Sequence, residues 1–171
     1  MAKTDNLRRQ NDKVHAGLAR AAALREELDA LTVDGVQQRL GGVLSSFGEE
    51  VVPHARAEEL VLYPAVAARF NLHLSSRLRR EHREMDRLLE GLADSHRRVA
   101  VDGMVPAELS GQLGAMVRLM RGQLRTEEEV VLPMLEANLD EAEAYALYER
   151  MEEALFEDAA ARTVERNPSA R

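Results

Sequence analysis

The chain has 171 residues, a formal net charge of −7 and no cysteine. This length is typical of one domain with a single core, and the absence of cysteine excludes disulfides, thiolate metal sites and cysteine nucleophiles. The acidic balance argues against nucleic acid as a partner, because binding phosphates requires a clustered positive surface. No stretch is apolar over a length that would span a bilayer, so we expect a soluble, cytoplasmic protein without a membrane partner.

The composition favours helices, because aromatic residues make up only 4% of the chain and Leu, Ala, Glu and Arg dominate. Turn-forming residues divide the chain at three places: Asp34-Gly35, Asn71 and Asp102-Gly103. Short turns between long helices make antiparallel neighbours. The pattern therefore predicts an all-α fold, an antiparallel up-and-down four-helix bundle over residues 1–138. A short additional C-terminal helix over 139–158 should pack on it, followed by a flexible tail over 159–171.

Two helices carry apolar stripes that step by four and three residues, as packed amphipathic helices do. Polar residues four apart interrupt each stripe at the same place. The stripes read Leu40, Leu44, Phe47, Val51, His54, Glu58, Val61, Ala65 and Leu109, Leu113, Met116, Met120, Gln123, Glu127, Val130, Met134. Because burying imidazole and carboxylate groups is costly unless they are paired or bind a metal, the interruption predicts a functional site.

The turn positions predict which polar residues meet, since residues equidistant from a turn lie at the same height in an antiparallel hairpin. His15 and His54 each lie about 20 residues from the first turn, and Glu58 and His82 lie about 13 and 11 residues from the second. One polar layer should therefore contain His15, His54, Glu58, His82, Gln123 and Glu127. Such ligands suit iron, manganese or zinc, and carboxylates can bridge two ions. The alternative is that each histidine is an isolated, hydrogen-bonded core residue.

Two prolines, Pro53 and Pro64, lie inside the second helical pattern. Each removes a backbone hydrogen bond to the preceding turn. We therefore expect a kink or bulge beside His54. Irregularities of this kind are often found at functional sites.

The polar residues lie in segments that resemble the hemerythrin-like cation-binding family. The matching segments are His15, His54-Ala-Arg-Ala-Glu58-Glu59-Leu-Val-Leu-Tyr-Pro64, Glu81-His82 and Arg125-Thr-Glu127-Glu128-Glu129-Val-Val-Leu-Pro133. The resemblance covers about residues 5–138 and implies a bundle that holds a non-haem iron pair and handles dioxygen, peroxide or nitric oxide. The ligands it implies are His15, His54, Glu58, His82 and Glu127. A single ion, or another divalent metal, stays open.

The chain departs from this family at two positions. Gln123 stands where members usually have a ligand histidine, and Leu78 stands where oxygen carriers have a further one. The loss at Leu78 argues against reversible oxygen storage. A glutamine oxygen is a weaker ligand than imidazole, so one metal would be under-coordinated or absent. Gln123 would then either coordinate a metal or line an open site.

Four acidic residues flank the implied ligands and are candidates to contact a metal or a ligand histidine: Glu50, Asp86, Glu59 and Glu128. The first two lie one turn from a histidine, and the other two follow a glutamate directly and would reach inward if the helix is bulged. Otherwise each is a solvated flank. Asn11, Arg25 and Glu50 are expected to line a substrate pocket, and Arg8 and Arg25 are candidates to receive an anion there.

Three functions remain open at this point. The first is a non-haem metalloprotein, diiron by the resemblance, with an open position that reacts with or senses a small oxidant. The second is a metal-dependent biosynthetic enzyme for a small organic substrate, with Gln123, Glu50 and Asp86 as candidate catalytic residues. The third is a metal-free regulatory or interaction bundle, in which the C-terminal helix binds a partner. The sequence decides neither whether the protein is an enzyme nor whether it is a monomer or a homodimer.

Overall fold

A computed structural model of the chain describes residues 3–70 and 72–166. Within these residues the elements follow in this order: α1 (Asp5–Glu27), the 3-10 turn η1 (Leu28–Ala30), α2 (Val33–Ser46), η2 (Phe47–Val51), α3 (Val52–Ala57), η3 (Glu58–Leu62), α4 (Tyr63–Arg69), α5 (Leu72–Asp102), α6 (Leu109–Thr126), η4 (Glu127–Val131), α7 (Leu132–Asn138) and α8 (Glu141–Arg166). The segments η2, η3 and η4 are π-helical. None of the described helices is long and apolar enough to cross a membrane.

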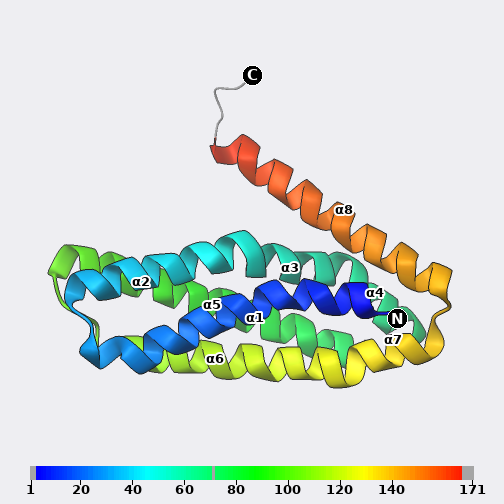
Figure 1. Ribbon diagram of the computed structural model, residues 1–171, viewed down its shortest axis with the longest axis horizontal. Coiled ribbons are helices and arrows are strands. Elements are labelled where there is room, and N and C mark those ends of the chain that lie inside the picture. The colour runs from blue at the N-terminus through cyan, green and yellow to red at the C-terminus, as the bar shows by residue number, and fades with distance from the viewer. Residues whose placement is uncertain (1–2, 71, 167–171) are drawn as a thin grey trace.

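Four long rods lie side by side and form the predicted antiparallel bundle (Figure 1). They are α1, the continuous α2 to α4, α5, and the continuous α6 to α7. The first turn ends at Thr32, whose side-chain oxygen accepts from the Gly35 N–H at 3.1 Å and caps α2. The third turn uses Gly103 at φ 65°, a left-handed conformation in which glycine carries no steric penalty. The all-α bundle predicted from the sequence is therefore confirmed.

The C-terminal helix α8 starts beyond α7 at one end of the bundle and runs obliquely past η3 and α3 (Figure 1), and it is longer than expected. Its first half buries Ala144, Leu147 and Met151 against the bundle. The expected tail over 159–171 is corrected for residues 159–166, because α8 continues to Arg166. The physical reason is local: residues 159–162 read Ala-Ala-Ala-Arg, which are strong helix formers. Residues 167–171 lie outside the described residues.

The apolar core has two parts with a polar layer between them. One part contains Val51, Met85 and Leu124, and the other contains Leu62 and Leu78. Along each rod the layer falls between these two groups. Its buried polar members are Asn11, His54, Glu58, His82, Gln123 and Glu127.

The π segments η3 and η4 each shift the buried stripe of their helix by one residue. Beyond Glu58 the buried residues are Leu62 and Val66, where an uninterrupted α-helix would bury Val61 and Ala65. Beyond Glu127 the same shift buries Val131 and leaves Val130 47% exposed. A proline follows each π segment within two residues, and it cannot supply the N–H of an α-helical bond. The bulge predicted beside His54 is thus present.

Candidate metal centre

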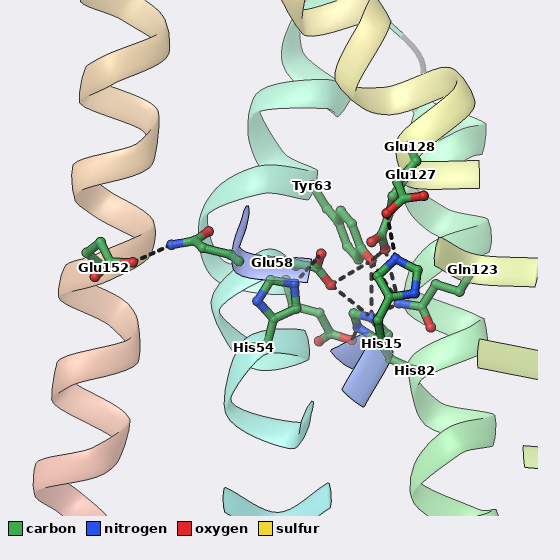
Figure 2. Close-up of polar contacts among 11 residues, drawn as sticks. His15, His54, Glu58, Tyr63, His82, Gln123, Glu127, Glu128 and Glu152 are labelled. Carbon is green, nitrogen blue, oxygen red and sulfur yellow. Dashed lines mark hydrogen bonds and ion pairs between the residues drawn. The ribbon is translucent and has the colours of Figure 1, made fainter. Parts of the chain in front are cut away.

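Three buried ligand groups converge in the polar layer. Glu58 of η3, His82 of α5 and Glu127 of η4 each offer one ligand atom, and these three atoms lie within 4.8 Å of one another (Figure 2). The three residues are at most 3% exposed. Carboxylate and imidazole donors at this spacing fit a borderline divalent cation. The cluster joins three of the four rods.

The Tyr63 hydroxyl lies at the centre of this cluster. It donates to Glu127 Oε1 at 2.9 Å or to Glu58 Oε2 at 3.3 Å, and it lies 3.1 Å from His82 Nε2. In an α-helix, residues five apart point about 140° away from each other. Here the Tyr63 N–H bonds to the Glu58 carbonyl, five residues back, which brings both side chains onto one face. Tyr63 was not among the residues expected at the site, although Pro64 indicated an irregular turn here.

Two buried side-chain atoms of the layer lack a hydrogen-bond partner among the described residues: His54 Nε2 and Gln123 Oε1. His54 Nε2 lies 3.1 Å from Glu58 Oε1, but outside hydrogen-bonding geometry. The Gln123 amide nitrogen donates to Glu127 Oε1 at 3.2 Å and contacts His82 Nε2. Buried polar atoms rarely stay unpaired in native proteins. A bound cation would use such lone pairs, so these residues fit a metal.

Two small internal voids border the carboxylates. Each has a volume of about 10 Å³, close to the smallest space that holds one water. His54, Glu58 and Glu127 line both voids; Gln123 lines one, and Asn11 lines the other. The layer therefore leaves room for a small ion or water beside its two carboxylates.

The pKa values of the two buried carboxyl groups in the layer are shifted in opposite directions. Burial tends to raise the pKa of Glu58, but the adjacent imidazoles of His54 and His82 hold it well below its ordinary value. Burial, together with the negative charge of Glu58, raises the pKa of Glu127 well above its ordinary value. Burial opposes the charge on His82, but Glu58 and Glu59 more than offset this and raise the His82 pKa. Without metal, the layer thus favours the charged forms of Glu58 and His82 and the neutral form of Glu127.

These shifts predict that the metal-free protein loses stability as the pH rises. Glu127 and His82 both have raised pKa values in the folded protein. Their stabilising contribution to the free energy of unfolding is therefore complete below the ordinary pKa values of 4.5 and 6.5, and it is lost as the pH rises through the folded-state pKa values. We expect the free energy of unfolding, measured with urea and a chelator, to be about 1–3 kcal/mol lower at pH 8 than at pH 6. An unfolding free energy that rises over this interval would contradict the assignment.

The structure does not bring His15 into the polar layer. Its side chain is 48% exposed, and its Nε2 lies 2.8 Å from Glu128 Oε1 at the surface. This placement corrects the expectation that both residues contact a buried metal. On α1 the inward positions are Leu7, Asn11 and Val14, so Asn11 is the polar residue that α1 gives to the layer.

The remaining flanking candidates lie around the cluster rather than in it. Glu59 Oε1 lies 3.1 Å from His82 Nδ1 and so orients the imidazole ring, whose Nε2 faces the cluster. Glu50 accepts from the Ser46 hydroxyl at 3.1 Å, and Asp86 is exposed on α5. Arg25 is corrected as a pocket residue, because it packs beside Gly114, near the first turn. Arg8 is exposed on α1.

The fold and the site together define an all-α bundle with a buried candidate cation site. The Hemerythrin HHE cation binding domain matches residues 2–104 and, a second time, residues 73–164. The chain belongs to this family, which confirms the resemblance seen in its sequence. No curated protein and no solved structure was found to match the chain.

Proposed function

We propose that the chain is a non-haem metalloprotein of the cytoplasm, whose buried cluster holds iron and reacts with or senses dioxygen, peroxide or nitric oxide. The observation that carries this proposal is the pair of unsatisfied lone pairs on His54 and Gln123, next to the converging Glu58, His82 and Glu127. Without a metal, these two buried atoms have no hydrogen-bond partner among the described residues, which is costly. This cost also speaks against a purely structural bundle.

The donor set supports one ion most directly. Glu58, His82 and Glu127 converge, and His54 lies beside Glu58. A pair of ions, which the family resemblance implies, would need weaker additional donors such as the amide oxygens of Gln123 and Asn11. The number of ions per chain is therefore part of the test below.

The surrounding side chains have distinct roles in this proposal. A bound iron ion supplies Lewis acidity and a change of oxidation state. Glu59 accepts from His82 Nδ1 and fixes the direction of the opposite nitrogen. Tyr63 holds a proton 2.9 Å from Glu127 Oε1, inside the buried layer, where it can be passed to a bound oxidant. Gln123 Oε1 would be a weak donor to the ion, so it would hold its coordination position less firmly than a histidine and leave it exchangeable.

Metal analysis combined with anaerobic reduction tests this proposal. Protein produced with iron should contain one or two ions per chain, and its near-ultraviolet absorption should change when the reduced protein meets oxygen, peroxide or nitric oxide. The double variant Glu58→Gln/His82→Gln should lose the metal and the spectral change. A matched variant of two exposed residues, Glu129→Gln/His73→Gln, should keep both. Metal-free protein, or a spectrum indifferent to all three oxidants, would refute the proposal.

A further inference from the structure

A cavity of about 570 Å³ lies between α1, the η2–α3 segment and α8. The Gln10 amide donates to Glu152 Oε1 at 2.6 Å and so ties α1 to α8 beside it (Figure 2). Three carboxylates and two basic side chains lie in its lining: Glu49, Glu50, Glu152, Arg9 and Lys13. Negative charge is in excess, which favours a cation over an anion in this space.

One of the two small voids joins this cavity to the polar layer. The void has a volume of about 10 Å³, and it is lined by Glu58 and Glu127 on the side of the cluster. Gln10 and His54 line both the void and the cavity. These two side chains therefore lie between the cavity and the buried carboxylates.

Both shared side chains carry a polar atom without a partner. Gln10 Oε1 and His54 Nε2 are buried, and neither has a hydrogen-bond partner among the described residues. His54 as a whole is only 6% exposed. An amide oxygen and an imidazole nitrogen are both ligands for divalent cations. A cation that crosses from the cavity to the void would thus find a ligand atom on each of the two side chains that it passes.

A second cavity, of about 400 Å³, offers a poorer path to the layer. It lies between α1 and the α6–η4 segment, and its charged arginines and glutamates are equal in number: Arg121, Arg125, Glu128 and Glu129. Leu124 is the one described residue that it shares with either small void. An apolar side chain offers no ligand atom to an ion that has lost water, so crossing there is costly.

We propose that the cavity beside α8 is the entrance through which a divalent cation reaches the buried cluster, and that Gln10 and His54 pass it inward. Glu58 and Glu127 are each 2% exposed, so an ion reaches them only when a side chain moves. This inference rests on the proposed metal site and adds its path. A barrier on a path affects uptake and release equally, because it leaves the free and bound states unchanged.

Cobalt(II) uptake and release by the full-length protein test the inference. Its visible absorption reports coordination, and it takes the same nitrogen and oxygen ligands as iron and zinc. Stopped-flow mixing measures uptake, and transfer to a chelator measures release. Gln10→Leu replaces the amide by an apolar side chain of similar size. It should slow uptake and release by the same factor, at least about tenfold, with the dissociation constant within about twofold of wild type.

A matched pair of tryptophan variants separates the two cavities. Ala159→Trp fills part of the cavity beside α8, and Ala19→Trp fills part of the second cavity; both alanines are exposed. Ala159→Trp should slow uptake and release at least about threefold, whereas Ala19→Trp should exchange cobalt like wild type. Circular dichroism should show unchanged helical content in both.

Wild-type or faster exchange in Gln10→Leu or Ala159→Trp would overturn the inference, and so would slowed exchange in Ala19→Trp. A changed dissociation constant with unequal effects on the two rates would show that Gln10 acts on the bound state rather than on the path, which also overturns it. Wild-type protein that binds no cobalt at equilibrium would refute the metal site and the entrance together. Failure of the path alone is therefore distinguishable from failure of the proposed function.

Discussion

Replacing Glu127 by glutamine should weaken metal binding at least about 100-fold and, at the same time, stabilise the metal-free protein. Glu127 is 2% exposed and faces Glu58, so burial and the negative charge of Glu58 raise its pKa and favour its neutral form when no cation is present. The amide keeps the shape of the side chain but removes both the metal-binding anion and the cost of ionisation. At pH 8 we expect the free energy of unfolding to rise by about 1–3 kcal/mol.

The measurements are metal titration and urea unfolding in the presence of a chelator. Glu129→Gln provides a matched control two residues away, because the Glu129 side chain is 61% exposed and pairs with Arg125. It should change neither quantity appreciably. Wild-type metal affinity of Glu127→Gln would show that Glu127 is not a metal ligand. A lower free energy of unfolding of the metal-free variant at pH 8 would contradict the raised pKa of Glu127.

Replacing Gln123 by histidine should raise metal affinity by about 10–100-fold, because an imidazole nitrogen is a much better donor than an amide oxygen. Gln123 lines one of the small voids together with His54, Glu58 and Glu127, so the new ring would lie beside both carboxylates. Filling the open position should also slow any reaction with an oxidant or an organic substrate. Metal titration and the reoxidation rate of the reduced protein measure these two effects.

Gln38→His serves as the control for an added histidine, since Gln38 is exposed on α2 and far from the layer along that rod. It should leave both quantities unchanged. A Gln123→His protein with wild-type metal affinity would show that position 123 does not face the ion. Faster reoxidation would show that Gln123 does not keep a position open.

The height of the polar layer followed from the sequence, because turn positions and helical rise fix where residues lie along a rod. Glu58, His82 and Glu127 meet as expected. The direction of a side chain around the rod is a separate quantity, and there the prediction for His15 was wrong. It follows the inward Val14 on α1 and points outward, whereas Asn11 points inward.

The hydrophobic periodicity also did not predict which residues face the interior beyond each π segment. The apolar stripes predicted from the sequence continue through Val61 and Val130. In the structure the π segments insert one residue, and Leu62 and Val131 are buried instead. Proline positions predicted that a bulge exists near His54, but not where the extra residue is inserted. Tyr63 was missed for this reason, since it reaches the cluster only through the wider turn.

The π segments at Glu58 and Glu127 have a consequence for how the molecule tolerates change. On either side of them the same rod presents a different face to the interior, so the two cores are packed in different registers and joined at the polar layer. At such a joint neither register supplies a matching apolar side chain. Each core can accordingly be repacked without rotating the other, whereas deleting one residue from η3 would turn α4 about 100° relative to α3 and disrupt both. The two carboxylates therefore lie at the level of the bundle that neither apolar core fills.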